Sequence, residues 1–481
     1  MSSEYDVIVI GAGAVGENVA DRAVQGGLTV ALVEAELVGG ECSYWACMPS
    51  KALLRSGEAV RAAQRVGGAS AAVTGDLDVQ AVLKRRDSFT SEWNDSGQVE
   101  WVQGAGIELV RGHAVFTGPR ELRVTAESGA ESILRARHAV VVCTGSTALL
   151  PDVPGLADAA PWTSREATSA QTIPARLTIV GGGVVAAEMA TAYATLGAAV
   201  DLVSRGTLLA GQEPFAGEIV ATSLEGLGVT LHLGHSPASV DRGADGVVRT
   251  TLDDGTVLEA EEILVATGRL PRTGDLGLEA IGLTPGDWLD TDDSLRVLGP
   301  DGKPFDGGWL YATGDVNHRA LLTHQGKYQA RAAGDAIAAR AAGDEIHDAP
   351  WGRHAATADH RSVPQVTFTD PPVASVGLTA KAAEEAGLRT RVVDYEIGSV
   401  AGASVHSDGY TGTARMVVDE DRQVIVGVTF VGPDVQELLH SATVAVVGEV
   451  PLSRLWHAVP SYPTISEVWL RLLEGYGRQS A

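Results

Sequence analysis

Apolar residues along the chain fall into short continuous runs that alternate with glycine-rich turns, and one such arrangement occurs twice. An apolar run at 6–10 leads into a glycine turn, a helical segment and a second apolar run at 29–33. The same order returns at 177–180 and 199–203. Buried strands of parallel sheets read as nearly continuous apolar runs. The pattern therefore predicts two βαβ units.

The first glycine turn fits a dinucleotide-binding fingerprint. Gly11, Gly13 and Gly16 follow the strand directly, and Glu34 ends the second strand. In such a turn the free N–H groups of the helix N-terminus bind a pyrophosphate, and the acidic residue accepts hydrogen bonds from an adenosine ribose. A tight turn without a ligand is the alternative. The spacing favours a dinucleotide site.

The second glycine turn differs from the first at the end of its unit. It contains Gly181 and Gly183, has Ala186 at the third glycine position, and its second strand ends at Ser204 and Arg205 rather than at an acid. The missing acid removes repulsion against a 2′-phosphate, which an arginine can bind through two N–H groups. This favours NADPH, with NADH still possible. A solvated surface arginine is the alternative.

Two of the three cysteines, Cys42 and Cys47, lie close together in the segment 39–51. On a straight helix they would lie about 140° apart around the axis and ~7.5 Å along it. A disulfide needs Cα atoms within about 7 Å. If the two cysteines pair, the first helical turn must be distorted, which Gly39 and Gly40 allow, while Pro49 suits the start of a regular helix. Two unpaired buried cysteines are the alternative.

The pattern G-G-x-C-x-x-x-x-C-x-P-S-K resembles the redox-active segment of the flavin-dependent pyridine nucleotide–disulfide oxidoreductases, which include dihydrolipoamide dehydrogenase, glutathione reductase, mercuric reductase and soluble transhydrogenase. The resemblance covers nearly the whole chain. It implies FAD at the first glycine turn and a redox-active Cys42–Cys47 disulfide, with Cys47 nearer the flavin and Cys42 attacking the acceptor. It also implies that Lys51 lies beside the flavin and pairs with Glu188. Further cofactor-binding positions implied by the resemblance are Gly40, Thr144, Gly145, Gly268, Arg269, Gly314 and Asp315.

The predicted fold class is α/β, with two Rossmann-like domains and a C-terminal α+β dimerisation domain. The expected domains are 1–155 for FAD and the disulfide, 156–275 for NAD(P)H, 276–355 completing the FAD site, and 356–481 for the interface. Local patterns predict a helix over 79–103, an antiparallel meander of strands at 107–110, 122–125 and 139–142, and a helix opening at 322–324. In the last domain they predict strands at 413–418 and 424–430 and a helix over 435–447.

The C-terminal segment departs from the family pattern. Where the family's disulfide reductases have H-P-T-x-S-E, this chain has Tyr462 in place of the histidine, and Glu467 is retained. Tyrosine, with an ordinary pKa near 10 against ~6.5, costs roughly 4–5 kcal/mol more to ionise at neutral pH. His457 is a possible substitute base. A second departure is Glu41 beside Cys42, because an unpaired carboxylate opposes thiolate formation.

Composition narrows the function classes. The 481 residues carry a net charge of −25, which opposes binding to nucleic acid or an anionic membrane. No apolar run reaches the roughly 18 residues of a membrane span, and no export signal is evident, so a cytoplasmic protein is expected. Three cysteines are too few for a disulfide framework, and Cys143 is expected to be a packing residue. No metal site is predicted.

The functional hypothesis is a homodimeric FAD enzyme that takes a hydride from NADPH and reduces the Cys42–Cys47 disulfide. The pair then reduces a small-molecule acceptor of disulfide, metal-ion or quinone type. Two alternatives remain open. In one, the flavin itself reduces a quinone or a second nucleotide without the cysteines, and in the other the protein is a flavin-bound redox sensor with slow turnover.

Overall fold

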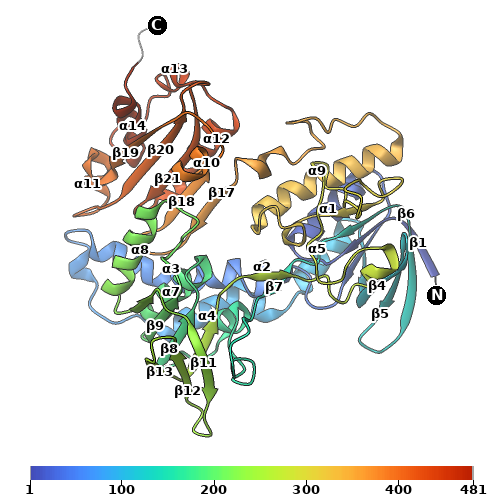
Figure 1. Ribbon diagram of the computed structural model, residues 1–481, viewed down its shortest axis with the longest axis horizontal. Helices are drawn as coiled ribbons and strands as arrows, with labels where there is room; N and C mark the ends of the chain where they lie inside the picture. Colours follow the sequence, from blue (N-terminus) through green and yellow to red (C-terminus); the bar gives the residue numbers. More distant parts are fainter. Residues whose placement is uncertain (1, 479–481) are drawn as a thin grey trace. The chain divides into compact units, whose positions relative to one another are not determined.

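The computed structural model describes Ser2–Arg478, and the chain divides into two compact units. The first unit comprises Met1–Pro49, Asp87–Leu149 and Gly268–His360, and the second comprises Ser50–Arg86, Leu150–Thr267 and Arg361–Ala481. Figure 1 shows the elements of both. Each unit gathers segments that are far apart in the sequence.

A large mixed sheet forms the centre of the first unit, in the strand order β3-β2-β1-β6-β5-β4 with β16 beside β6. The strands that pair in parallel are β1 (Ser2–Ile10), β2 (Val30–Glu34), β3 (Glu108–Arg111), β6 (Glu131–Val142) and β16 (Leu310–Ala312). Val7, Ile8 and Val9 of β1 are fully buried, as expected of a strand covered on both faces. The first predicted βαβ unit is confirmed.

The predicted antiparallel meander is only partly correct. β4 (His113–Gly118), β5 (Glu121–Thr125) and the first half of β6 do pair antiparallel. β3, which was expected to belong to this meander, pairs in parallel with β2 instead. The second half of β6 also pairs in parallel, with β1 and β16. An apolar run predicts a strand but does not identify its partner, because pairing depends on distant segments.

Two helices of the first unit, α1 (Ala14–Gln25) and α9 (Thr323–Ala342), pack closely along each other. Small residues make the approach possible. A Cβ atom at Gly326 would lie 2.5 Å from Val15 Cγ2, and one at Gly334 would lie 2.5 Å from Arg22 Cβ. Figure 1 shows α9 alongside α1. The helix predicted to open at 322–324 is confirmed.

The single helix predicted over 79–103 is wrong. The chain forms α4 (Val79–Phe89), a short 3-10 turn η2 (Ser91–Trp93) and α5 (Ser96–Gly104). Ser91, Glu92 and Trp93 have φ values of 49°, 53° and 56°, in the left-handed region that no α-helix contains. The break lies within a polar stretch that has no glycine to mark it.

The second unit contains the second predicted βαβ unit. Its parallel sheet has the order β10-β9-β8-β14, formed by β8 (Arg176–Val180), β9 (Ala199–Ser204), β10 (Thr230–Leu233) and β14 (Glu262–Val265). The connecting helix is α7 (Val184–Thr195), as predicted. Flanking elements are α6 (Ser164–Ser169), α8 (Pro214–Gly226) and an antiparallel sheet of β11 (Pro237–Arg242), β12 (Val248–Leu252) and β13 (Val257–Ala260).

The C-terminal part of the second unit is an antiparallel sheet in the order β17-β18-β21-β20-β19. Its strands are β17 (Pro364–Thr367), β18 (Val373–Gly377), β19 (Thr390–Glu396), β20 (Thr413–Asp419) and β21 (Val424–Val431). The helices are α10 (Ala380–Glu385), α11 (Ala401–His406), α12 (Val435–Val447), α13 (Leu452–Leu455) and α14 (Val468–Tyr476). The strands and the helix predicted here are confirmed.

Several short elements complete the fold. In the first unit β7 (Ser146–Ala148) and β15 (Arg269–Pro271) pair antiparallel. Short 3-10 helices are η1 (Ser70–Ala72), η3 (Leu278–Ile281), η4 (Asp315–Asn317), η5 (Thr357–His360), η6 (Ile397–Ser399) and η7 (Ile465–Glu467).

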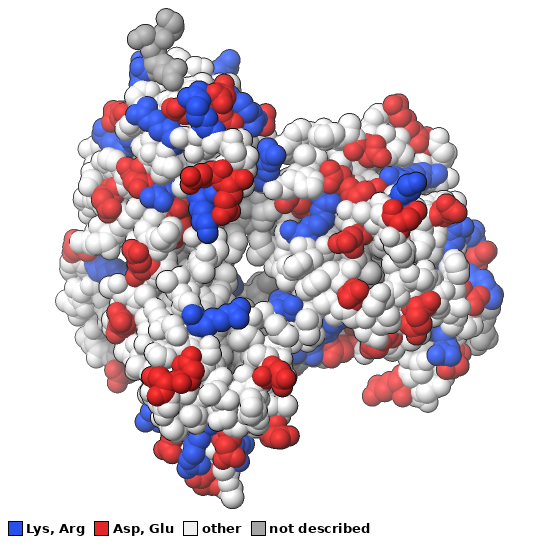
Figure 2. Space-filling view, in the orientation of Figure 1, with Lys and Arg blue, Asp and Glu red and all other residues white. Residues whose placement is uncertain are grey.

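Among the described residues, no helix combines the length and the apolar character that crossing a membrane requires. Acidic residues outnumber basic ones by 61 to 36, and Figure 2 shows both kinds spread over the visible face without one large basic patch.

Candidate functional site

The segment that carries the two cysteines is bent at both ends. Gly39 and Gly40 enter it with φ values of 112° and 59°. Helix α2 (Gly40–Tyr44) stops at Trp45, whose φ is −136°, and α3 (Cys47–Gln64) begins at the second cysteine. The predicted distortion between the cysteines is therefore confirmed, and Pro49 lies in the first turn of α3, as expected.

Cys42 and Cys47 are free thiols in this structure, so the disulfide between them stays a prediction. Cys47 Sγ lies 3.3 Å from the hydroxyl of Thr323, the first residue of α9. Hydrogen bonding to Cys47 raises the pKa of the Cys42 thiol, burial and the charge of Cys47 raise it further, and Thr323 and Lys327 act against them. The two thiols are thus close enough to share a proton.

Glu41, the acidic neighbour of Cys42, is paired. Arg272 donates to its carboxylate at 2.8 Å, and the backbone N–H of Arg272 donates to the carbonyl of Gly145 at 3.1 Å. An unpaired carboxylate at Glu41 would oppose formation of a thiolate at Cys42. Because Glu41 is paired with Arg272, this effect is not expected.

The first glycine turn makes backbone contacts that leave no room for side chains. A Cβ atom at Gly16 would lie 1.9 Å from the carbonyl oxygen of Gly11, and one at Gly40 would lie 2.8 Å from Gly13 Cα. Gly13 caps α1 without a side-chain hydrogen bond, so the first N–H groups of α1 are not capped by it. Glu34 accepts from the N–H of Ala12 at 2.7 Å, beside the same turn.

Ser146 and Asp315 meet at the next part of the predicted FAD site. The hydroxyl of Ser146 donates to Asp315 at 2.5 Å, and Arg269 donates to the same hydroxyl at 2.5 Å. Burial raises the pKa of Asp315, whereas the hydrogen bond from Ser146 and the charge of Arg269 lower it. Cys143 is buried and lies 3.1 Å from the Thr313 hydroxyl, so it packs as expected.

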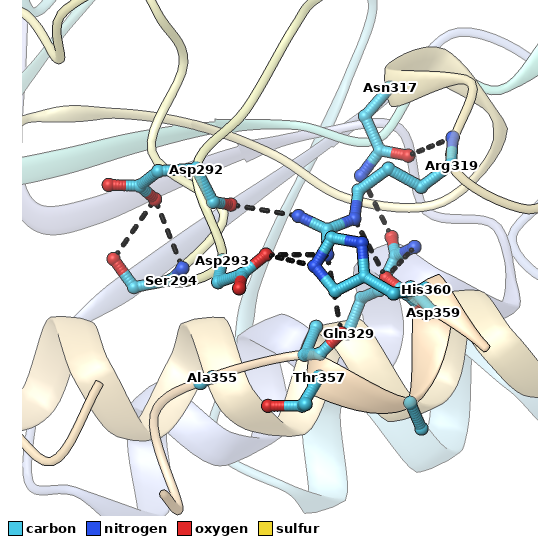
Figure 3. Close-up of polar contacts among 12 residues, drawn as sticks. Asp292, Asp293, Ser294, Asn317, Arg319, Gln329, Ala355, Thr357, Asp359 and His360 are labelled. Atoms are coloured by element: carbon cyan, nitrogen blue, oxygen red, sulfur yellow. Dashed lines mark hydrogen bonds and ion pairs between the residues drawn. The ribbon is translucent and has the colours of Figure 1, made fainter. Parts of the chain in front are cut away.

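Figure 3 shows Asn317, Arg319, Gln329 and Asp359 within a polar network, and this network holds the Gly314–Asp315 segment. The amide oxygen of Gln329 accepts from the N–H of Gly314 at 2.8 Å and from Asn317 at 2.9 Å. The amide nitrogen of Gln329 donates to Asp359 at 2.9 Å, and Arg319 lies 3.0 Å from the same carboxylate. Because every partner is satisfied, the network fixes the position of the Gly314 N–H.

These residues fit FAD. The Thr144 hydroxyl is buried without a hydrogen-bond partner among the described residues, and Gly145, at φ 72°, has open space where a Cβ would stand. An orphaned hydroxyl beside an uncapped helix N-terminus is the arrangement that a phosphate-bearing ligand completes. Gly11, Gly13, Gly16, Glu34, Thr144 and Asp315 would hold it.

The second glycine turn, like the first, makes backbone contacts that leave no room for a Cβ atom. A Cβ at Gly181 would lie 2.3 Å from the carbonyl of Ala266, and one at Gly182 would lie 2.3 Å from the Ser204 hydroxyl. Ser204 is therefore packed against the turn. Arg205 follows it and is exposed, and its side chain makes no hydrogen bond or ion pair within Ser2–Arg478. Its guanidinium is available to a ligand.

Lys51 and Glu188 form an ion pair in the second unit. Lys51 donates to Glu188 at 2.7 Å, the N–H of Phe368 donates to the other carboxylate oxygen at 3.0 Å, and Glu188 is only 3% exposed. The Lys51 ammonium also lies 4.8 Å from the Phe368 ring centroid. The pairing is present, whereas the role of the pair beside a flavin stays a prediction.

The C-terminal candidates are not joined to one another. Tyr462 is 76% exposed, while Glu467 is buried and accepts from the N–H of Gly402 at 3.1 Å. His457 is exposed just after α13. Among the described residues no hydrogen bond links any two of these three side chains.

Comparison with known proteins now decides the family. The family described as "Pyridine nucleotide-disulphide oxidoreductase" matches residues 5–336, and its dimerisation domain matches residues 363–472. The chain belongs to the pyridine nucleotide–disulphide oxidoreductase family. FAD, a redox disulfide and a dimerisation domain are general features of this family.

Relatives cover almost the whole chain. It is 31% identical to the dihydrolipoyl dehydrogenase of Halobacterium salinarum, over 98% of this chain and 96% of that protein. It is also 31% identical to a mercuric reductase of Shigella flexneri, over 97% of this chain and 80% of that protein. The fold matches the HOCl-induced flavoprotein disulfide reductase RclA of Escherichia coli with a TM-score of 0.80 at 22% identity, over 98% and 99% of the two chains.

Sequence reasoning missed several residues near the thiols. The motifs indicate Thr323 only as part of a helix start, and they give no indication of Arg272, Lys327 or Glu17. The one available signal is at Glu17, an acid in a helix that also carries Val19, Ala20 and Ala23, all fully buried. The other residues lie about 230 to 285 positions from the cysteines, too far for spacing to reveal them.

The buried carboxyl of Glu17 should make stability depend on pH. Burial raises the pKa of Glu17 from 4.5 to about 7. As pH rises, the unfolded chain therefore releases this proton before the folded protein does. The free energy of unfolding should fall by about 2–4 kcal/mol between pH 4.5 and 7. Glu17→Gln should therefore raise the urea midpoint of the FAD-loaded protein at pH 8 and change it little at pH 5. Glu127→Gln, at an exposed site, is the control. An equal change at both pH values would contradict this account.

Proposed function

We propose that the protein is an FAD-dependent NADPH oxidoreductase that reduces a Cys42–Cys47 disulfide and passes the electrons to a small-molecule acceptor. The observation that carries the proposal is the thiol pair at the break between α2 and α3, with Thr323 against Cys47. When bound, FAD would supply the two-electron redox chemistry that links the nicotinamide nucleotide to the cysteine sulfurs. The family match supports this general course.

The chain's own residues have distinct parts in the proposal. Cys47 is the sulfur nearer the flavin, and the N-terminus of α9, reached through Thr323, stabilises its thiolate. Cys42 is the thiol that attacks the acceptor. Lys51, held by Glu188, presents positive charge where reduction adds negative charge.

The acceptor is proposed to be of metal-ion or quinone type rather than an ordinary disulfide. Tyr462 at the histidine position supports this, because a phenol does not readily exchange its proton at neutral pH. A mercuric reductase is among the relatives at 31% identity. Reduction at the flavin without the cysteines remains the rival hypothesis, which replacing Cys42 tests.

A homodimer is part of the proposal. The dimerisation domain matches residues 363–472, and Val459 and Tyr462, just before it ends, are 85% and 76% exposed. Large apolar and aromatic side chains exposed this far are typical of an interface. In the proposed dimer, Tyr462 and Glu467 serve the thiol pair of the partner subunit.

The direct test is the colour of the half-reduced protein. A Cys47 thiolate against the flavin should give a long-wavelength absorbance band on anaerobic addition of two electrons, because a helix N-terminus favours the thiolate. The band should be lost in Cys47→Ser and kept in Cys143→Ser, whose sulfur is buried elsewhere. Reduction of the wild-type protein without this band would overturn the proposed electron path.

Arg205 should set the nucleotide preference. NADPH should be preferred, and Arg205→Glu should shift the ratio of kcat/KM towards NADH, because it removes a phosphate partner and adds a repelling charge. Arg176→Glu, at an exposed arginine of β8, controls for the change in charge. Equal kcat/KM for both nucleotides in the wild type would remove the basis of this prediction.

Tyr462 should limit disulfide reduction. A positioned imidazole contributes about 10²–10⁴-fold to proton transfer, so lipoamide and glutathione disulfide should react far more slowly than a quinone or metal-ion acceptor. Tyr462→His should raise kcat/KM for the disulfides if Glu467 orients the new ring. Tyr462→Phe is the matched control. Fast reduction of either disulfide by the wild type would show that another group is the base.

A further inference from the structure

One face of α9 is directed at the thiol pair. Thr323 and Lys327 are four residues apart, so they lie on the same side of the helix. Thr323 Oγ1 is 3.3 Å from Cys47 Sγ, and the charge of Lys327 acts on the Cys42 thiol. Lys327 is half-buried and has no hydrogen bond or ion pair with any residue from Ser2 to Arg478.

Glu17 lies on the neighbouring helix. A Cβ at Gly326 would lie only 2.5 Å from Val15, so α1 and α9 are in close contact there. Lys327 is the next residue along α9, and Glu17 is two residues further along α1. Glu17 is 8% exposed, and its Oε1 atom is buried without a hydrogen-bond partner among the described residues. A buried carboxylate without a partner is costly, and such a group in a native protein calls for an explanation.

The charged and titratable groups around both residues are few. Glu17 faces Lys327 of α9, Glu34 of β2 and the phenol of Tyr44 in α2. The groups around Cys42 are Cys47 of α3, Thr323 and Lys327 of α9, and its neighbour Glu41, whose carboxylate is paired with Arg272. Lys327 is the group common to both sets.

We propose that Lys327 is a positioning residue that promotes ionisation of the Cys42 thiol, and that Glu17 controls how much of its positive charge acts on that thiol. The inference rests on the proposed function, since it concerns the thiol that attacks the acceptor. A histidine at position 462 would have supplied a positive charge to such a thiol when protonated. In this chain α9 supplies it from the same subunit.

The charge state of Glu17 determines how strongly Lys327 favours ionisation of Cys42. When Glu17 is protonated, the full charge of Lys327 favours the Cys42 thiolate. When Glu17 ionises, which burial delays by raising its pKa to about 7, its negative charge offsets part of that effect. Replacing Lys327 by a neutral residue should therefore raise the pKa of the Cys42 thiol, and replacing Glu17 by glutamine should lower it.

The test titrates Cys42 without turnover. In the FAD-loaded Cys47→Ser protein, the rate of iodoacetamide reaction at Cys42 is followed by mass spectrometry from pH 6 to 10. Adding Lys327→Met should raise the apparent pKa and slow alkylation at pH 8 by about three- to tenfold, since one pKa unit is a factor of ten. Lys327→Arg should restore the rate. Glu17→Gln should lower the apparent pKa and speed the reaction above pH 7.

Two controls keep the outcome interpretable. Lys381→Met removes an exposed lysine on α10 and should leave the titration unchanged. The limiting rate fitted to the alkaline end of each titration reports access to Cys42, so an equal limit in all variants shows that only ionisation has changed. An unchanged titration in Lys327→Met, with that limit preserved, overturns the inference.

The outcome is separable from the proposed function. Acceptor turnover that depends on Cys42, together with a titration insensitive to Lys327, would reject the inference alone. A titration that shifts as expected in a protein whose NADPH oxidation does not depend on Cys42 would reject the proposed function alone.

Discussion

The structure depends on backbone segments that touch where no side chain fits. A Cβ atom at Gly16 would stand 1.9 Å from the Gly11 carbonyl, one at Gly11 would stand 2.6 Å from the Cys143 carbonyl, and one at Gly40 would stand 2.8 Å from Gly13 Cα. These contacts bring the first turn of α1, the end of β6 and the start of α2 to one point. The cysteine segment begins at that point, so the dinucleotide turn and the thiol pair are positioned by the same close packing. A larger residue at any of these glycines would push the first turn of α1 away from the cysteine segment or from the end of β6.

Charges around the thiols and the cofactor sites are mostly neutralised in pairs. Glu41 is paired with Arg272, Glu188 with Lys51, and Asp359 with Arg319. Paired carboxylates keep their charge when buried, because a partner replaces part of the lost solvation. Glu17 does not follow this rule, and its burial shifts its titration towards neutral pH. Glu17 differs from these three carboxylates in having no ion pair with any of the described residues, so nothing but the charge of the more distant Lys327 opposes the effect of its burial.

The sequence predicted what is local and missed what is not. Helix α12 was predicted with its observed bounds, and both βαβ units were recognised, because apolar periodicity and glycine spacing are properties of adjacent residues. The partner of β3 was misassigned, since strand pairing joins segments some 75 residues apart. The break at Ser91–Trp93 has no glycine or proline to signal it. Of the site, the cysteines and the glycine turns were found from their motifs, whereas Arg272 and Lys327 reach the cysteines only through the fold.

The position of α9 beside the thiols allows residues of the same subunit to influence their reactivity. A histidine on the C-terminal segment would place acid–base control of the thiols in the dimer interface, and it would be lost whenever the subunits separate. Here Thr323 contacts Cys47, and Lys327, one turn further along α9, acts on Cys42. Both belong to the unit that contains the thiols. If the proposals above hold, thiolate stabilisation comes from within one subunit, and the residue at position 462 is left to select acceptors. Since a phenol neither carries positive charge nor exchanges its proton readily near neutral pH, that division would favour acceptors whose reduction requires no protonated leaving thiol.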